Sequence, residues 1–583
     1  ILHYLGNPAS THGDWRNVIV VPADDENWNT HLNQAEKLIN SIDTLDPVYN
    51  IDKIYFDAYK KQSTPGGGRY PDVNREIVGR VEKGALLVNY VGHGGEVGWA
   101  DERVLEISDI NAWTNYERMG MFFTATCEFS RFDNPLHTSA GELVFLNPEG
   151  GAMSMITTTR LAFASSNSNL NLSFADTLFD ASSHEIPRLG DVLKYTKNTN
   201  GNSPNTRHLT LFGDPSMRLP IPQHRVYTTS ITDAVTGKPA DTLFANSLVT
   251  VSGEVRRVDG TLMDGFTGVL YVKVFDKPSK VKTLGQHPES FVVEFKVQKN
   301  IVYQGKATVK DGRFTFTFPV PRDIDYSIGN GKISYYATNG FEDAHGYSAD
   351  FKIGGSVAQQ QTDLTGPEIR LFLNDTNFIN GGITSENPKL IAYLFDESGI
   401  NTVGNGIGHD IVATIDGDSY DGIVLNDYYV SDLDSYQSGV INYQYFNLPD
   451  GDHTLTLKAW DVFNNSGQTS INFTVKRKII LAVDEVVAYP NPSGADVWFR
   501  FGHNQFDGKF DVELNVYSSS GMLVRTIGPE RVISEGYTAG NIHWDGRNND
   551  GSPARAGLYL CRLMIRDRNG YTSGNTVKVV MVR

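Results

Sequence analysis

Long apolar runs are missing from this chain. No stretch approaches about 18 consecutive apolar residues, so the sequence excludes a membrane-spanning helix. Positive charge is also in short supply, because 51 Lys and Arg face 68 Asp and Glu, which gives a formal net charge of −17. That balance argues against nucleic acid, and against an anionic membrane surface, as a partner.

The residues that are present indicate a large β-rich protein. The chain has 583 residues, of which 20% are charged and 11% aromatic, and 56 are glycine. A length of this order exceeds a single hydrophobic core and predicts about four domains. The composition is typical of extracellular β-rich proteins rather than of disordered ones.

The first 220 residues alternate buried strands with helical patterns. Such alternation is the signature of an α/β domain with a parallel sheet buried on both faces. The predicted strands are Asn17–Val21, Ala85–Val91, Met121–Thr126 and Gly151–Thr158, and the predicted helices are Thr30–Ile42 and Pro71–Lys83.

Two chemically distinctive residues close two of these strands. His93 follows the strand 85–91 within Val91-Gly92-His93-Gly94-Gly95, and Cys127 follows the strand 121–126. Because reactive groups in parallel sheets gather past the carboxyl ends of strands, we expect them to meet there, together with the acidic pair Asp24-Asp25. A lone cysteine is more often a small core residue. Cys127, however, leads into a polar and charged segment, 128–133, where a core thiol is not expected.

A cysteine and a histidine at this edge predict nucleophilic catalysis. A free thiol with a pKa of about 8.5 is mostly protonated at neutral pH, so an imidazole must stabilise the thiolate and then protonate the leaving amine. The glycines beside His93 let a substrate carbonyl approach the backbone. The amides of Gly94 and Cys127 are therefore predicted to form an oxyanion hole.

Four ordered motifs resemble the gingipain-type cysteine peptidase family, which has a caspase-like fold. They are VNYVGHGGEVGWA (88–100), FFTATCEFSRFDNP (122–135), GGAMSMITTTR (150–160) and LTLFGDPSMRL (209–219). The resemblance implies that Cys127 is the nucleophile, that His93 is the general acid/base, and that the Gly94 and Cys127 amides are the oxyanion donors. It also implies a carboxylate that orients His93, for which Asp24 is the best match, with Asp25 and Glu26 close to it in sequence.

The family pattern is broken just before the first predicted helix. Arginine-cleaving relatives have an acid there, whereas this chain has Trp28-Asn29-Thr30. Without an acid a buried guanidinium would be unpaired, so trypsin-like specificity is not expected. The loop Thr159–Phe163 corresponds to a family segment that lines the substrate cleft, or it is an ordinary connection between strand and helix.

The remaining chain reads as β-domains. Alternating strands such as Leu248–Val255, Val269–Phe275 and Phe314–Val320 predict a β-sandwich over 221–355, and a polar linker is expected at Gly354–Gln361. A second, immunoglobulin-like sandwich is predicted over 366–477. Its acidic loop Asp427–Asp434 is a candidate for structural calcium, and no other cofactor is expected.

The last hundred residues resemble the C-terminal sorting domains of type IX secretion. The resemblance rests on Tyr489-Pro490-Asn491-Pro492, Trp544-Asp545-Gly546 and Gly557-Leu558-Tyr559, and we expect an immunoglobulin-like domain over 484–583 with Trp544 in its core. The predicted fold class is therefore multidomain: an α/β caspase-like peptidase domain (1–220, preceded in the family by a further N-terminal portion), β-sandwich domains and this terminal domain.

Together these parts resemble family members that act as sortases of the type IX secretion system. The resemblance implies a protein on the outer face of the bacterial outer membrane that cuts sorting domains from secreted cargo. Cargo would pass through a Cys127 thioester to an amine of anionic lipopolysaccharide, and residues 484–583 would bind an outer-membrane β-barrel protein. A secreted endopeptidase that uses water and a non-catalytic scaffold are the alternatives. We expect both cysteines to be free, because a disulfide to Cys561 would disable Cys127.

Overall fold

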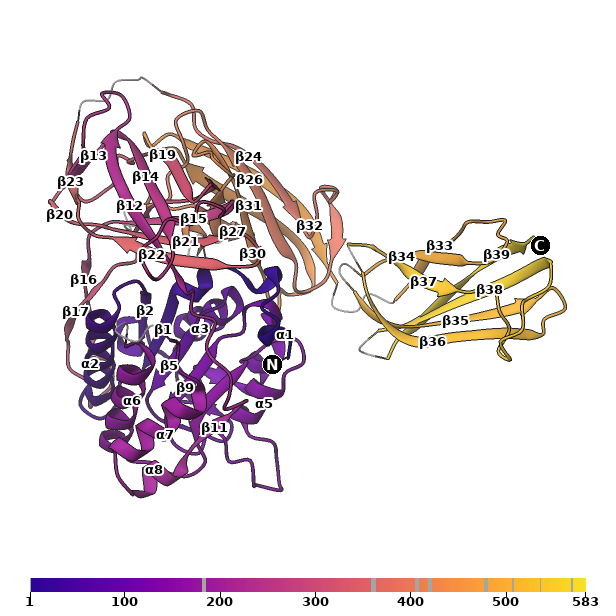
Figure 1. The fold of residues 1–583 in the computed structure, drawn as a ribbon, viewed down its shortest axis with the longest axis horizontal. Helices are drawn as coiled ribbons and strands as arrows, with labels where there is room; N and C mark the ends of the chain where they lie inside the picture. The colour runs from indigo at the N-terminus through magenta and orange to yellow at the C-terminus, as the bar shows by residue number, and fades with distance from the viewer. Residues whose placement is uncertain are drawn as a thin grey trace.

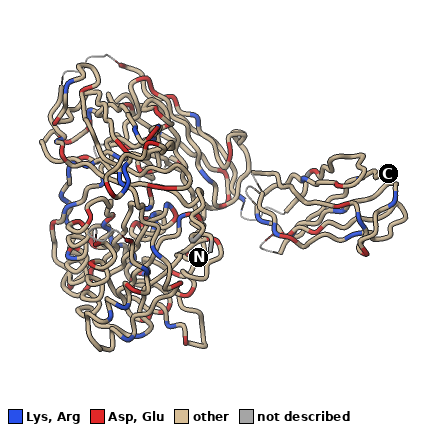
Figure 2. Tube along the Cα trace, viewed as in Figure 1, with Lys and Arg blue, Asp and Glu red and all other residues tan. Residues whose placement is uncertain are grey.

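The computed structural model of the protein describes residues 2–180, 185–357, 363–403, 408–417, 422–476, 481–505, 508–534, 536–567 and 570–582. The molecule is multidomain and mostly β. A helical N-terminal part carries β-rich parts above it, and the yellow C-terminal part extends to one side (Figure 1). Acidic and basic residues are interspersed over all of these parts (Figure 2).

A six-stranded sheet organises the N-terminal part, in the order β11-β10-β9-β5-β1-β2. All neighbours pair in parallel except β10 and β11, which are antiparallel, so the predicted parallel sheet is confirmed. Every residue of β5, β9 and β10 is buried, as expected for strands covered on both faces. The strands are β1 (Val18–Ala23), β2 (Asn50–Tyr55), β5 (Leu87–Val91), β9 (Met121–Ala125), β10 (Ser154–Thr158) and β11 (Leu209–Phe212).

Helices cover both faces of this sheet. The two helices predicted from periodicity are present as α2 (Thr30–Leu45) and α3 (Pro71–Lys83). One face packs against α2, α6 (Ala164–Leu178) and α7 (Leu189–Thr199), and the other against α3, α4 (Ile107–Ala112) and α5 (Ala140–Leu146). Two short helices, α1 (Leu2–Leu5) and α8 (Pro204–His208), complete this part, and Tyr4 of α1 joins the core on the α2 face. Small sheets join β3 (Gln62–Thr64) to β4 (Gly67–Arg69), and β6 (Gly94–Gly95), β7 (Gly98–Trp99) and β8 (Leu105–Glu106) to one another.

The segment predicted as a β-sandwich over 221–355 is a closed barrel instead. Its two end strands close the sheet because β12 pairs in parallel with β22 at His224 and Arg225. In chain order the barrel strands are β12 (His224–Asp233), β14 (Leu248–Arg256), β15 (Gly268–Phe275), β18 (Ile301–Lys310), β19 (Arg313–Pro319), β21 (Lys332–Thr338) and β22 (Asp343–Ser348).

Two smaller sheets accompany the barrel. A hairpin is formed by β16 (Ser279–Lys282) and β17 (Glu294–Val297), and a second sheet by β13 (Thr242–Ala245), β20 (Gly329–Asn330) and β23 (Lys352–Ser356). The expected linker at Gly354–Gln361 is therefore wrong at its start, since residues 354–356 belong to β23. Residues 358–361 of that linker lie outside the described residues.

The third part has two sheets around one apolar core. One sheet contains β24 (Glu368–Leu373), β26 (Lys389–Phe395), β29 (Tyr429–Ser431) and β30 (Ser438–Gln444). The other contains β25 (Gly382–Thr384), β27 (Val412–Ile415), β28 (Ile423–Val424), β31 (Gly451–Trp460) and β32 (Ser466–Val475).

The C-terminal part also has two sheets and its own core, in which Trp544 is fully buried, as predicted. They are β33 (Val483–Tyr489), β34 (Val497–His503) and β37 (Thr538–Trp544), and β35 (Lys509–Ser518), β36 (Leu523–Ile533), β38 (Gly557–Arg566) and β39 (Thr572–Met581). Among the described helices, none combines the length and the apolar character needed to cross a membrane.

Polar contacts fix the N-terminal part against its neighbours. Arg16, 2% exposed, is held 2.6 Å from Asp343 of the barrel, and Arg80 lies 2.8 Å from Asp427 of the third part. An ion pair between Lys509 and Glu149 links the C-terminal part to the same domain. Breaking a buried pair such as Arg16–Asp343 typically costs about 3–5 kcal/mol, so the barrel is firmly seated on the sheet domain.

Candidate active site

His93 and Cys127 leave the same edge of the sheet on neighbouring strands. β5 and β9 pair in parallel with Val91 opposite Ala125, and each functional residue lies two positions beyond its strand end. The two loops touch, because a Cβ atom built on Gly94 would lie only 2.7 Å from Thr126 Oγ1. The structure thus brings the predicted nucleophile and base to one place.

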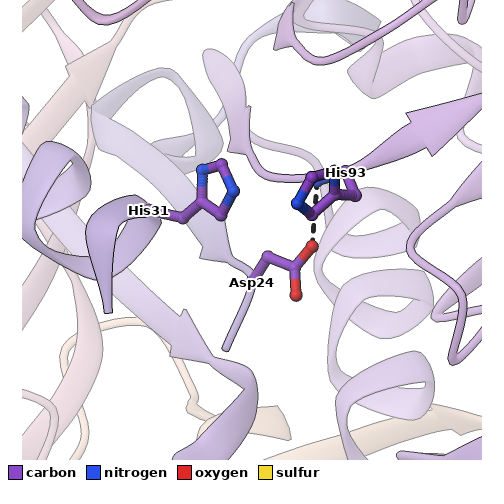
Figure 3. Close-up of side chains that lie close together, drawn as sticks. All are labelled: Asp24, His31 and His93. Carbon is purple, nitrogen blue, oxygen red and sulfur yellow. Dashed lines mark hydrogen bonds between the residues drawn. The ribbon is translucent and has the colours of Figure 1, made fainter. Parts of the chain in front are cut away.

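The backbone around His93 is tightly held. Its N–H donates to Asp24 Oδ2 at 2.9 Å, the contact drawn in Figure 3, and its carbonyl accepts from Tyr90 Oη at 2.6 Å and from the Ala100 N–H at 2.9 Å. A side chain at Gly92 would come within 2.6 Å of Asp24 Cβ. Glycine is needed at position 92 because the chain passes so close to this carboxylate.

The three acids named from sequence take different positions around His93. Asp24 binds the histidine backbone, Asp25 accepts from Tyr70 Oη at 2.6 Å, and Glu26 approaches the ring, with Oε2 3.6 Å from His93 Nε2. The role of Asp24 in orienting the ring stays a prediction, since its hydrogen bond in this structure is to the main chain.

Two residues that the sequence did not single out contact the imidazole of His93. The Asn27 side-chain amide lies 2.5 Å from His93 Nε2 and 3.2 Å from His31 Nε2, and the two rings meet edge to face at 5.0 Å. His31 is 3% exposed on the first turn of α2. Nothing in the spacing along the chain marks Asn27 or His31, because only the fold brings this turn beside His93.

The thiol of Cys127 has other partners. Its Sγ atom lies 3.4 Å from both the N–H and the carbonyl oxygen of Ala162, in the loop predicted to line the cleft. Within the part of the chain that the structure describes, Cys127 and His93 do not hydrogen bond to each other. Catalytic hydrogen bonds are often long or misaligned without substrate, so this geometry does not disqualify the pair.

The barrel also contributes to this edge of the sheet, through the loop 283–293 between β16 and β17. Asp57 accepts the N–H groups of Gly285 at 2.6 Å and Gln286 at 2.9 Å. Asn29 exchanges two hydrogen bonds with the backbone of Phe291, at 2.7 and 2.9 Å. The sequence offered no signal for this contact, because the two segments are separated by more than two hundred residues.

Trp28 and Phe291 form an exposed aromatic pair where this loop meets the sheet domain. The ring of Phe291 lies 5.4 Å from the ring of Trp28, and these residues are 55% and 58% exposed. Trp28 occupies the position where arginine-cleaving relatives were expected to have an acid. On the cysteine side, Leu161 and Phe163 are 69% and 72% exposed. The surface near both functional residues therefore offers apolar side chains to a ligand.

Burial shifts the pKa values of three side chains near His93. Loss of water raises the pKa of Asp24 well above its usual value, opposed by the His93 N–H and reinforced by Asp25 and Glu102. Burial likewise raises the pKa of Glu26. The pKa of His31 falls to about 4, because burial and then the neighbouring His93 both disfavour its cation. His31 is therefore a neutral ring at physiological pH.

The acidic loop proposed for calcium has protein partners for two of its carboxylates. Asp427 pairs with Arg80, and Asp434 accepts from the Thr308 backbone N–H at 2.7 Å. Calcium at this loop stays a prediction. Another group of carboxylates, Asp363, Asp396 and Asp461, has oxygen atoms within 4.8 Å of one another in the third part.

The sequence of the N-terminal domain matches the model of a known protein family. Residues 1–220 match the family model described as peptidase family C25. The N-terminal domain is therefore similar to C25 peptidases. The resemblance to gingipain-type cysteine peptidases is thereby confirmed for the segment that holds His93 and Cys127. A curated relative, Lys-gingipain W83 of Porphyromonas gingivalis, is 27% identical over 139 residues, which span 24% of this chain and 7% of the relative.

Solved structures of related proteins also resemble the chain. Dimeric latent PorU from Porphyromonas gingivalis matches 97% of this chain and 64% of its own, at 21% identity and a TM-score of 0.29. The Arg-specific cysteine proteinase gingipain R (RgpB) matches 59% of this chain and 68% of its own, at 14% identity and a TM-score of 0.30. This chain spans less than two thirds of the PorU chain that it matches.

Proposed function

We propose that the protein is a cell-surface cysteine sortase of the type IX secretion system. It would cut the C-terminal sorting domain from secreted cargo and transfer the cargo to an amine of anionic lipopolysaccharide. The observation that carries the proposal is the pairing of Val91 with Ala125, which puts His93 and Cys127 at one edge of the C25 domain. A nucleophile and a base on adjacent loops are what acyl transfer requires.

The chemistry would proceed through a thioester. His93 takes the proton of the Cys127 thiol, and the sulfur attacks the carbonyl carbon of the scissile peptide bond. As that C–N bond breaks, His93 returns the proton to the departing amine, which is the N-terminus of the sorting domain. The acceptor amine then attacks the thioester and loses one proton through His93, and the thiol of Cys127 is restored.

Two backbone groups favour oxyanion stabilisation. The Ala100 N–H bond to the His93 carbonyl makes Gly94 and Trp99 a non-hydrogen-bonded pair, so the Gly94 N–H points away from β7. Among the described residues, no acceptor binds the N–H of Cys127. Both donors are thus free to meet a developing negative charge, and each such donor is typically worth about 100-fold or more in rate.

Catalysis would require the imidazole to change partners. The ring of His93 is 43% exposed and is held by the Asn27 amide, whereas the thiol faces Ala162. Since exposed rings reorient quickly, binding of substrate between the two loops can exchange the Asn27 contact for one to Cys127. The present contacts of His93 would then belong to the state before that exchange.

We further propose that the substrate residue beside the cut is apolar, which the surroundings of the site support. Trp28 and Phe291 flank it on the His93 side, and Asn29, next to Trp28, is already satisfied by the backbone of Phe291. Positions 28, 29 and 30 carry no carboxylate, although a basic substrate side chain would need one there. We expect cleavage after residues that an aromatic surface can cover rather than after arginine.

The C-terminal part is proposed to dock on an outer-membrane β-barrel protein. The motif residue Asn491 fastens its loop to the last strand, because its side chain donates to the Lys578 carbonyl at 2.7 Å and accepts the Val580 N–H at 2.9 Å. This part extends away from the remaining domains in Figure 1, which leaves its surface accessible to a partner.

Intact-mass analysis of a cargo tests this function. Cargo with a C-terminal sorting domain is incubated with the protein, or with its Cys127→Ala variant, in the presence and absence of an amine acceptor. The proposal predicts cargo whose new C-terminus carries the amine, formed only by the unaltered protein. A free carboxylate despite saturating amine would reduce the protein to a peptidase that uses water, and uncut cargo in every reaction would favour a scaffold.

A further inference from the structure

We propose that Asp24, His31 and His93 form a reversible inhibitory site for a divalent transition-metal ion of the Zn²⁺ class. One ligand atom from each of the three residues lies within 4.8 Å of the others. The three side chains come from the end of β1, the first turn of α2 and the loop after β5, and they converge in Figure 3. Neither the peptidase chemistry nor the C25 match assigns a role to His31.

The Asn27 amide marks where the ion would sit. Its nitrogen lies 2.5 Å from His93 Nε2 and 3.2 Å from His31 Nε2, so it faces the lone pairs of both rings. Zn²⁺ binds imidazole nitrogen at about 2.0–2.1 Å. Replacing the amide by an ion therefore requires His93 Nε2 to move by about 0.5 Å and His31 Nε2 by about 1.1 Å, while Asp24 approaches from within 4.8 Å of both rings.

The chemistry of the donors selects the ion. Two imidazoles and one carboxylate suit Zn²⁺ and its neighbours in the first transition row, whereas Ca²⁺ and Mg²⁺ prefer oxygen ligands. His31 Nδ1 is buried without a well-formed hydrogen bond among the described residues, and the Gln34 side chain is the polar group that interacts with this ring.

The Asp24 carboxylate can serve as third ligand without giving up its present contacts. Its two oxygens accept the N–H groups of Asp25 and His93, at 2.8 and 2.9 Å, and each oxygen retains a further lone pair. With three protein ligands the ion keeps an open position for water, as catalytic zinc sites do. Exchange should therefore be faster than at a closed four-ligand structural site.

Inhibition follows from the identity of one ligand. A metal-bound His93 cannot take the proton of Cys127, so the loaded protein would hold a resting thiol. Binding itself does not depend on the proposed function, and only its inhibitory consequence does. The site differs from direct metal capture by the thiol because Cys127 is not among its ligands.

Calorimetric titration with ZnCl₂ tests the site in the full chain carrying Cys127→Ala, which removes the thiol as a ligand. One Zn²⁺ per chain is expected, with affinity reduced more than about 100-fold by His31→Gln, because loss of even a second-shell partner costs 10–100-fold. His137→Gln is the matched control, since His137 belongs to the same domain but pairs with Glu96. Equal affinity in the His31→Gln and control proteins, or no binding to Cys127→Ala, would overturn the proposal.

Cobalt absorption provides a readout that does not depend on the folding of one variant. Co²⁺ added to the protein with Cys127 intact should give ligand-field bands of a nitrogen and oxygen site. An intense thiolate-to-metal charge-transfer band would instead place the ion on Cys127 and contradict the assignment. In parallel, Zn²⁺ should lower the rate of peptide cleavage relative to each protein's metal-free rate, and His31→Gln should lose most of that inhibition.

Discussion

The two cysteines of this chain occupy opposite environments. Cys561 is fully buried in β38, within the core of the C-terminal part, and burial raises its pKa to about 12. Cys127 is partly exposed in the loop after β9, with backbone polar groups of Ala162 against its sulfur. The residue type is the same, so the difference in expected chemistry comes from position: a strand interior protects a thiol, and a strand end presents it.

The largest effect on activity is expected when each cysteine is replaced in turn. Cys127→Ala should lower the rate of peptide cleavage by about 10⁴-fold or more, because removal of a nucleophile leaves only binding and the oxyanion donors. Cys561→Ala should leave the specific activity of the folded protein within about twofold. The loss of a buried thiol far from the site affects stability rather than catalysis. The measurement is kcat/KM on a fluorogenic peptide, with folding checked by circular dichroism. Comparable losses in both variants would break the contrast.

Thiol labelling compares the reactivity of the two cysteines directly. At pH 7 an ordinary thiol is about 3% thiolate, so an ion pair with His93 can accelerate alkylation of Cys127 by up to about 30-fold. Iodoacetamide should therefore label Cys127 in the folded protein, and His93→Ala should remove that acceleration. Cys561 should react only after unfolding. Peptide mapping by mass spectrometry gives both rates, and a Cys127 rate unaffected by His93→Ala would contradict an activated pair.

Removing the Asn27 side chain should produce a smaller change in the opposite direction. The Asn27 amide donates to His93 Nε2 and therefore competes with the thiol for this nitrogen. Asn27 has a positive φ of 57°, so Asn27→Gly deletes the amide without backbone strain. One hydrogen bond is worth about 0.5–1.5 kcal/mol, so labelling of Cys127 should accelerate roughly fivefold.

The matched control for that experiment is Asn29→Gly, at a neighbouring position with φ of 59°, whose side chain binds Phe291 rather than His93. It should leave the labelling rate unchanged. Slower labelling in Asn27→Gly would instead mean that the amide orients the ring for catalysis.

The last expected effect is on stability rather than on reactivity, at Cys561. Its folded pKa of about 12 lies above the ordinary value of 9.0, so the unfolded chain loses this proton first as the pH rises. The stabilisation is complete below about pH 9 and is lost between about pH 9 and 12, at up to about 1.4 kcal/mol per pH unit. Urea unfolding at several pH values, followed by tryptophan fluorescence, should show a weaker pH dependence in Cys561→Ala. Parallel curves for the two proteins would contradict the buried thiol.

The parallel sheet could be predicted because its signals are local. Continuous apolar runs such as Met121–Ala125 need cover on both faces, and the spacing of apolar residues in Pro71–Lys83 gives a helix of the same bounds. The placement of His93 and Cys127 followed from the rule that parallel strands end at one edge. The closure of the barrel did not follow, because it depends on a pairing between His224 and Ala344, distant in the chain, that leaves no periodic trace.

The surroundings of the site were less accessible to sequence reasoning. A carboxylate near His93 was expected, but proximity in sequence could not tell that Asp24 would bind the backbone while Glu26 approached the ring. Asn27 and Phe291 lie in loops whose conformations are set by tertiary contacts. Their positions beside the site depend on the loop 283–293, which is held by hydrogen bonds to Asp57.

The most direct test of the account is detection of the Cys127 acyl-enzyme itself. The protein is mixed with a short sorting-domain cargo without an acceptor amine, quenched in acid within seconds, and its intact mass is measured. The account predicts a mass increase equal to the N-terminal cargo fragment less one water, discharged by hydroxylamine and absent from Cys127→Ala. Cleavage of cargo by Cys127→Ala at the rate of the unaltered protein would contradict it.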